Sequence, residues 1–237
     1  FEVLVGTILS HLYNGGQVSA VKIAQISQFA ENVYFGKPSG LMDQMASSVG
    51  GFIAIDFKDT SSPIIESVPA DFEKFGHALC IVDAKGNHAD LTDEYAAIPQ
   101  EMKAVAGYFT CDTLRQLSKD DIMLNIRVLR EQFGDRAVLR SIHFFDENER
   151  VDKLVHALKA GNFEDFLSSV KESGDSSYKY LQNIYAASDI KHQCLSIALN
   201  VAEYSLHRKG ACRVHGGGFA GTIQAFVPLA PAVQNEH

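Results

Sequence analysis

Gly40-Leu41-Met42-Asp43-Gln44-Met45-Ala46-Ser47 sets one acidic residue between a turn and the start of an apolar helix. The preceding Lys37-Pro38-Ser39 ends any helix that runs up to it, because proline restricts the backbone of the residue before it. A carboxylate at Asp43 faces the positive end of the new helix dipole, which favours its ionised form. Two interpretations stay open: an ordinary residue of a helix N-terminus, or a group that accepts or orients a substrate proton.

The composition narrows the classes of function. A formal net charge of −8 argues against binding to nucleic acids or anionic membranes. No run of about 20 apolar residues is present to span a bilayer. Four scattered cysteines without a Cys-x-x-Cys pair argue against a zinc site and for a reducing, cytoplasmic location. The sequence carries no signal for an oligomeric state.

Hydrophobic periodicity predicts an α+β fold that is helix-rich in its second half. Residues 2–13 are apolar on most sides, which predicts a buried helix ended by Asn14-Gly15-Gly16. A weak linker at Pro69-Ala70-Asp71 predicts two domains, 1–70 and 71–237. The elements expected in the first domain are helices over 2–13 and 18–35, a short helix ending at 49, and a hairpin of strands over 52–57 and 64–68.

The second domain is expected to begin with a buried strand over 77–83 and to end with two strands, 211–215 and 222–227. Between them, Pro99 is expected to kink or divide the first helix. Ser188 is expected to cap the last helix and Gly210 to close it. The helices expected before Ser188 cover 91–109, 119–132, 135–144, 147–159 and 162–185.

A glycine turn is the second distinctive feature, with four glycines in six residues between two predicted strands. The cluster is either a tight strand connection with bulges or a backbone surface placed against a ligand. The stretch from His88 to Tyr95 follows the buried strand, and Thr92 is its expected N-cap. The glycines of the turn are Gly216, Gly217, Gly218 and Gly221.

These stretches resemble motifs of the galactokinases, within the GHMP small-molecule kinase superfamily. Gly40-Leu41-Met42-Asp43-Gln44 is similar to the Gly-x-x-Asp-Gln signature of that family. The segment from Gly210 to Gly221 is similar to its glycine-rich third motif. It departs from the usual spelling by His215 in place of Thr, by Ala220 in place of Gly and by the additional Cys212. The motifs occur in the family's order, and the resemblance covers essentially the whole chain.

The resemblance implies a two-domain GHMP kinase-like architecture and ATP-dependent phosphorylation of the anomeric hydroxyl of galactose, with ATP and Mg²⁺ as cofactors. It makes Asp43 the catalytic acid/base and places the sugar against Gly40, Asp43 and Tyr95. A tyrosine suits that position, because its ring packs on a sugar face and its hydroxyl bonds a sugar oxygen. The glycine turn, with Gly216, Gly217, Gly218 and Gly221, would lie near the active site.

The family holds the nucleotide phosphates with a Gly- and Ser-rich loop at a helix N-terminus, and this loop would lie immediately before Phe1. The sequence also has no Gly-x-x-x-x-Gly-Lys-Ser/Thr loop. We therefore expect a fragment truncated at both ends, with an incomplete N-terminal domain, no metal ligands of its own and no activity by itself.

Three alternatives to a galactokinase stay open from the sequence. The first is a kinase for another sugar, such as N-acetylgalactosamine. The second is a galactokinase-like sensor that binds sugar and nucleotide but regulates a partner. The third is a plain α+β interaction domain, for which the three motifs would not cluster in space.

Overall fold

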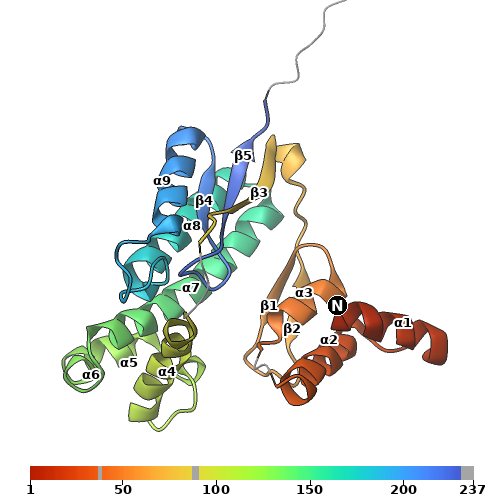
Figure 1. The fold of residues 1–237 in the computed structure, drawn as a ribbon, viewed down its shortest axis with the longest axis horizontal. Coiled ribbons are helices and arrows are strands. Elements are labelled where there is room, and N and C mark those ends of the chain that lie inside the picture. Colours follow the sequence, from red (N-terminus) through yellow and green to blue (C-terminus); the bar gives the residue numbers. More distant parts are fainter. Residues whose placement is uncertain (37–38, 87–90, 231–237) are drawn as a thin grey trace, which may run out of the picture. The chain divides into compact units, whose positions relative to one another are not determined.

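The computed structural model describes residues 1–36, 39–86 and 91–230 (Figure 1). The chain divides into two compact units, Phe1–Ala70 and the part from Asp71 onward. Their assignment to the two domains of a GHMP kinase stays a prediction. Three residues discussed above lie outside the described ranges: Lys37, Pro38 and His88.

The first unit combines helices with a two-stranded antiparallel hairpin, as the sequence predicts. Gly15 follows the first helix in the left-handed conformation, with φ of 59°, which glycine adopts at little cost. Ser19 caps the second helix by accepting a hydrogen bond from the Lys22 N–H. The elements are α1 (Glu2–Asn14), α2 (Ala20–Phe29), the π-helical turn η1 (Ala30–Tyr34), α3 (Met42–Val49), β1 (Ile53–Asp56) and β2 (Ile64–Ser67).

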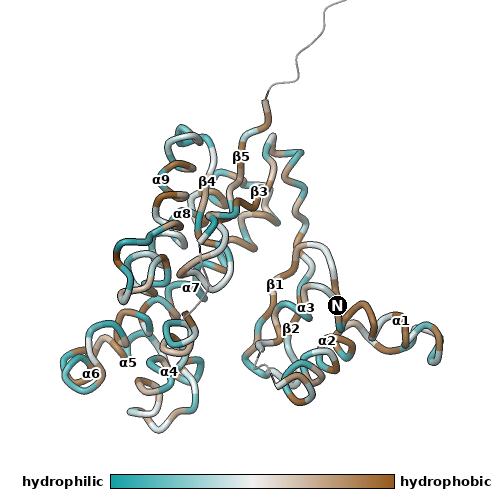
Figure 2. Tube along the Cα trace, in the orientation of Figure 1, coloured by the Kyte–Doolittle hydropathy of each residue, from teal (hydrophilic) through white to brown (hydrophobic). Residues whose placement is uncertain are grey.

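Helix α1 forms where it is predicted, but the prediction that it is buried is wrong. Leu4, Leu9 and Leu12 are 60%, 49% and 69% exposed, and Figure 2 shows hydrophobic residues along the helix. Within the first unit α1 contacts α2 and α3. These neighbours cover one side of the helix, and the apolar residues on its other sides stay exposed.

The start of α3 is anchored by buried side chains. Leu41 and Met45 are 6% and 0% exposed and form a core cluster with Ala24 of α2. Burying side chains of this size contributes about 1.5–3 kcal/mol each. The cluster therefore fixes the main chain on both sides of Asp43.

The second unit is built on a three-stranded antiparallel sheet in the order β3-β5-β4. Helix α9 covers one face, where Leu195 packs in a core cluster with Val214 and Ile223. Helix α8 lies against β4, and the ring of its Phe166 meets Phe226 edge-on, with 4.9 Å between centroids. The strands are β3 (His77–Asp83), β4 (Ala211–His215) and β5 (Thr222–Pro228).

Strand β3 forms as predicted, but it is not buried. Leu79 and Ile81 are 41% and 51% exposed. Among the described residues β3 pairs with β5 alone, so it lies at an edge of the sheet. The covering helices contact the other strands: α8 lies on β4, and α9 lies on β4 and β5.

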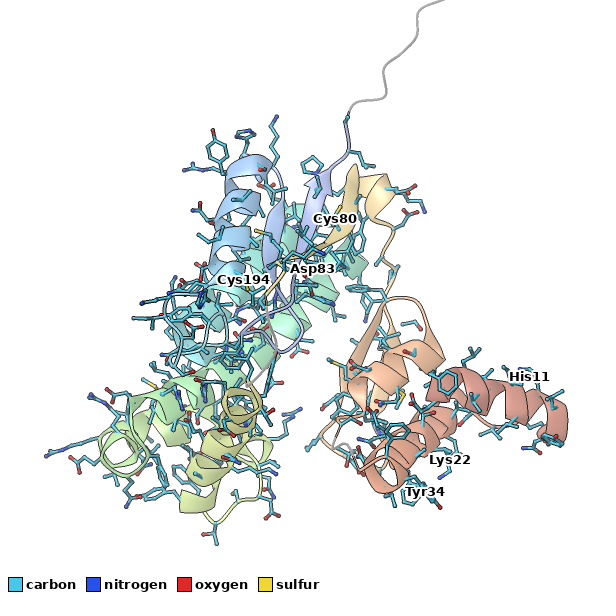
Figure 3. All side chains as sticks on the ribbon, in the orientation of Figure 1. His11, Lys22, Tyr34, Cys80, Asp83 and Cys194 are labelled. Atoms are coloured by element: carbon cyan, nitrogen blue, oxygen red, sulfur yellow. The ribbon has the colours of Figure 1, made fainter. Side chains whose placement is uncertain are left out.

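Figure 3 labels Cys80 of β3 and Cys194 at the start of α9, which are two of the chain's four free cysteines.

Two helices predicted over 135–144 and 147–159 are one helix of 26 residues, α7. No glycine or proline interrupts its sequence, so nothing breaks the backbone hydrogen bonds. In contrast, the helix predicted over 119–132 divides at Asn125. The predicted helix that contains Pro99 continues through it as α4. The helical elements of this unit are η2 (Phe72–Phe75), α4 (Thr92–Tyr108), η3 (Leu114–Gln116), α5 (Lys119–Leu124), α6 (Ile126–Phe133), α7 (Asp135–Ala160), α8 (Phe163–Ser176), the π-helical turn η4 (Ser177–Leu181) and α9 (Cys194–Leu206).

Three predicted helix ends are wrong. Leu91, not Thr92, is the N-cap of α4. Helix α9 begins at Cys194 rather than after Ser188, and the chain from 182 to 193 is irregular. Helix α9 also ends at Leu206, because His207 turns to the left-handed conformation with φ of 46°.

The predicted α+β class is confirmed: each unit combines helices with one small antiparallel sheet. In the part of the chain that the structure describes, no helix is both long and apolar enough to cross a membrane.

Candidate functional site

The signature aspartate lies in the first helical turn of α3, as the sequence predicts. Its side chain is exposed, whereas the flanking Leu41 and Met45 are buried. Within the described part of the first unit, the Asp43 carboxylate forms no hydrogen bond or ion pair. The fold therefore presents this carboxylate on a fixed main chain with its oxygens available to another group.

A polar network holds the turn that precedes Asp43. The Ser39 N–H donates to Asn32 Oδ1 at 2.7 Å, and its hydroxyl donates to Glu31 Oε2 at 3.0 Å. Gln28 donates to the Ser39 carbonyl oxygen at 3.0 Å. Gln44, which follows the signature aspartate, donates to the same Glu31 oxygen at 2.6 Å. The network thus connects both ends of the turn to α2 and η1.

Sequence reasoning missed this network. Gln28, Glu31 and Asn32 are spaced by three and four residues, which places them on one face of a helix. A polar stripe of this kind directly before a signature turn was the available signal. Among the described residues, the side-chain oxygen of Gln44 is buried without a hydrogen-bond partner, whereas its amide nitrogen donates to Glu31.

Gly40 borders open space. A cavity of about 550 Å³ lies in the first unit beside Gly40, Leu41 and Met42. A Cβ added at Gly40 would meet no atom of the described residues within 4 Å, and the φ of Gly40 is not in the left-handed region. Neither backbone conformation nor packing within this unit therefore requires glycine at position 40.

The glycine turn connects β4 to β5, which pair up to His215 and Thr222. Gly216, Gly218 and Gly221 have φ of 72°, 85° and 96°. These values lie in the region that residues with a side chain rarely adopt. Phe219 also has a positive φ, 57°, and its ring is buried. The main chain of the turn therefore has an unusual conformation, which contacts with neighbouring residues must stabilise.

Asn183 holds the turn from one side. Its carbonyl oxygen accepts the Phe219 N–H at 2.5 Å, and its side-chain amide donates to the Gly217 carbonyl oxygen at 3.1 Å. A Cβ on Gly218 would overlap the Asn183 carbonyl oxygen. Asn183 is 2% exposed. The sequence did not reveal it, because residues 162–185 were predicted to be one helix.

Tyr95 holds the turn from the other side. Its hydroxyl donates to the Gly218 carbonyl oxygen at 2.8 Å, and its ring meets Phe219 edge-on with 5.2 Å between centroids. A Cβ on Gly217 would lie 2.8 Å from Tyr95 Cε1, so a side chain at that position would displace the tyrosine ring. Burial raises the pKa of Tyr95. Since the hydroxyl has one proton and gives it to Gly218, it can only accept a further hydrogen bond.

Arg213 connects the strand before the turn to the helices beneath it. Its Nη1 donates to Ser173 Oγ at 2.6 Å and lies 3.3 Å from Glu147 Oε1. Burial lowers the pKa of the Arg213 guanidinium, while the charge of Glu147 opposes that shift. Nearby, burial also lowers the pKa of His143, whose ring bonds Ser176. These polar contacts fix β4 on α7 and α8.

The structure thus brings Tyr95 and the glycine turn together in the second unit, while Gly40 and Asp43 lie together in the first. Among the described residues, no three His, Cys, Asp or Glu side chains come together in a group that could hold a metal ion.

Comparison with known proteins finds galactokinases among the relatives of this chain. Residues 1–51 match the model of the GHMP kinases N terminal domain. A galactokinase of Glaesserella parasuis is 29% identical over 211 residues, which cover 89% of this chain and 52% of that protein. A galactokinase of Streptomyces coelicolor is 28% identical over 234 residues, covering 97% and 56%. The chain therefore spans about half the length of the curated relatives it matches.

A solved structure shares the fold. The crystal structure of Lactococcus lactis galactokinase complexed with galactose superposes with a TM-score of 0.74 and 24% sequence identity. The match covers 96% of this chain and 56% of that one.

Proposed function

Because the chain is related to the galactokinases over most of its length, we propose that the intact protein is a galactokinase-like sugar kinase. It transfers the γ-phosphoryl group of ATP to the anomeric hydroxyl of galactose and forms galactose 1-phosphate. The observation that carries the proposal is the exposed Asp43 in the first turn of α3, held by buried neighbours within a signature similar to that of galactokinases. We place the protein in the cytoplasm, since all four cysteines are free thiols.

Asp43 is assigned the role of acting on the proton of the attacking hydroxyl. The anomeric oxygen forms its bond to phosphorus while the bond to the leaving ADP oxygen breaks, and the hydroxyl proton passes to the carboxylate. A carboxylate is a weak base for a sugar hydroxyl, but phosphoryl transfer passes through a loose transition state. The proton therefore leaves late, and Asp43 serves either as its acceptor or as the group that orients the hydroxyl.

Gly40, Tyr95 and the glycine turn are assigned to sugar binding. No neighbour in the first unit explains glycine at position 40, which supports a close approach of the sugar to the backbone there. Tyr95 offers an acceptor to a sugar hydroxyl, since its own proton is given to Gly218. Its contacts with Gly217 and Gly218 also supply a reason for the glycines of the turn.

ATP and Mg²⁺ belong to the proposal as phosphoryl donor and counter-ion. The described residues contain no cluster suited to a metal ion, so we assign neither group to residues of this chain and derive no step through them. The sequence also lacks a Gly-x-x-x-x-Gly-Lys-Ser/Thr loop. We therefore expect the 237-residue chain alone to be inactive.

The test is a phosphorylation assay on the intact protein with ATP, Mg²⁺ and a panel of galactose, glucose and N-acetylgalactosamine, with the product identified by phosphorus NMR. We expect galactose 1-phosphate as the main product. A preference for N-acetylgalactosamine would revise the proposed substrate but leave the proposed role of Asp43 unchanged. Binding of galactose and ATP without turnover would contradict the kinase and indicate a sensor.

A further inference from the structure

The second unit contains a cavity that the proposed function does not use. Its volume is about 270 Å³, which is room for about nine water molecules at the ~30 Å³ that each occupies in the liquid. That is the scale of a single sugar ring rather than of a nucleotide. Its wall comes from α4, α7, η4 and the segment after η4, and its polar and aromatic lining consists of Glu94, Arg136, Tyr178, Lys179, Gln182 and Tyr185.

Arg136 supplies a fixed donor. Its Nε donates to Glu101 at 3.0 Å and its Nη2 at 2.5 Å, so two sides of the guanidinium are held. The remaining nitrogen, Nη1, lies 3.9 Å from Glu94 Oε2, which is beyond hydrogen-bond distance. Arg136 thus has N–H groups left for a ligand oxygen, in an orientation that Glu101 fixes.

Glu94 supplies an acceptor on the same wall. Its side chain is 16% exposed, and its closest hydrogen bond, from the Ser188 hydroxyl, is long at 3.4 Å. A carboxylate that is partly buried gains from stronger donors. The nearness of a donor on Arg136 and an acceptor on Glu94 matches a ligand whose groups both donate and accept.

Two tyrosines complete the wall. The rings of Tyr178 and Tyr185 lie 6.2 Å apart between centroids at 62°. The Tyr178 hydroxyl lies 3.3 Å from Ser196 Oγ, whereas no hydrogen bond holds the Tyr185 hydroxyl among the described residues. Aromatic rings beside planar polar groups suit the apolar face of a sugar.

We propose that this cavity is a second site for a neutral, polyhydroxylated ring of monosaccharide size, distinct from the site of phosphoryl transfer. Hydroxyl groups donate to Glu94 and accept from Arg136 at once, and they bring no charge into the cavity. The Glu94 carboxylate repels a phosphate, and the cations Arg136 and Lys179 are already paired with Glu101 and Asp175. The cavity therefore holds negatively and positively charged side chains together, which favours a neutral ligand over a charged one.

The site connects to the glycine turn through one residue. Gln182 and Tyr185 line the cavity, and Asn183 between them binds Phe219 and Gly217 of the turn. A ligand that orders the segment 182–185 therefore also orders the turn. The cavity thereby couples a bound sugar to the stability of the turn.

The proposal is tested by amide NMR on the 237-residue chain, titrated separately with galactose, glucose and inorganic phosphate. We expect saturable shifts at Gln182, Tyr185 and Phe219 with at least one of the sugars, and none with phosphate. Phosphate binding with equal shifts, or no saturable shift with either sugar, overturns the proposal. Sugar shifts confined to Gly40 and Tyr95 would also overturn it while supporting the proposed kinase.

Variants sharpen this test. Glu94→Gln keeps the shape and removes the charged acceptor, and we expect it to raise the sugar dissociation constant about tenfold or more. Tyr185→Phe keeps the ring and is expected to weaken binding about threefold or more. The exposed Tyr204→Phe on α9 is the matched control and should change nothing. Unchanged sugar affinity in both Glu94→Gln and Tyr185→Phe would show that the sugar does not bind in this cavity. The amide spectrum of each variant checks that it is folded.

Discussion

Two turns carry the resemblance to galactokinases, and they are built in opposite ways. At the turn before α3, polar side chains hold the loop, and the assigned catalytic group is an exposed side chain, Asp43. At the glycine turn, a buried amide and a tyrosine hold the loop, and the exposed part is main chain, at Gly216 and Gly217. The first turn presents a charge, whereas the second presents a backbone surface.

This difference predicts different sensitivities. The Asp43 side chain is exposed and has no hydrogen bond or ion pair among the described residues of its unit. We therefore expect its replacement to lower the activity and to leave the stability of the fold unchanged. A backbone conformation that needs glycine cannot be changed without cost to the fold. Substitutions at the first turn should therefore separate activity from stability, and those at the second should not.

The largest effect is expected from Asp43→Asn in the intact protein. Removing a positioned proton acceptor costs about 10²–10⁴ in turnover, while sugar binding and the unfolding midpoint should stay near those of the parent. The measurement pairs steady-state kinetics with galactose titration. Asp120→Asn is the matched control, because Asp120 is also an exposed aspartate in the first turn of a helix. If turnover of Asp43→Asn stayed within a factor of a few of the parent's, Asp43 would have no role in the chemical step.

Gly218→Ala should destabilise the second unit most among the substitutions considered. A Cβ there overlaps the Asn183 carbonyl oxygen and meets a φ of 85°, so we expect a loss of about 2–5 kcal/mol in urea unfolding. Gly216→Ala has a similar φ but meets nothing within 4 Å, and should cost about 1–2 kcal/mol from backbone strain. Equal losses in the two variants would show that the Asn183 contact does not hold the turn.

Tyr95→Phe should have a smaller effect on stability. The hydrogen bond to Gly218 is lost, but the ring keeps its contacts with Gly217 and Phe219. We expect a loss of about 0.5–1.5 kcal/mol and increased hydrogen exchange at the turn amides. Tyr108→Phe on the same helix is the control, since none of the hydrogen bonds among described residues involves the Tyr108 hydroxyl. Unchanged exchange at the turn would argue against Tyr95 as its support.

Ser39→Ala is expected to change stability least. It removes the hydroxyl contacts with Glu31 and Asn32, whereas the main-chain hydrogen bonds of Ser39 stay. The expected loss is at most about 1 kcal/mol in thermal unfolding. Ser47→Ala, at an exposed position of α3, should be neutral or slightly stabilising. A loss above 2 kcal/mol from Ser39→Ala would mean that the hydroxyl alone, rather than the whole network, holds the turn.

The sequence was most informative where local chemistry decides the structure. The end of α1 at Gly15, the hairpin of β1 and β2 and the strands around the glycine turn all follow from glycine angles and the alternation of apolar residues. The glycines and Tyr95 were recognised as separate features, but the hydrogen bond between them joins residues 123 positions apart. No local pattern predicts such a contact.

The predictions that were wrong have a common cause, because tertiary contacts determine these features and the local sequence does not show such contacts. Helix α1 and strand β3 are apolar enough to be buried, yet their exposure depends on which elements reach them. Asn183 falls in a stretch whose periodicity favours a helix, and the irregular chain from 182 to 193 instead places its amide on the glycine turn.

A crystal structure of the intact protein with galactose bound tests the central claim most directly. The account predicts a galactose whose anomeric hydroxyl lies within about 2.6–3.2 Å of the Asp43 carboxylate. A galactose found only at sites that do not touch Asp43 would contradict it.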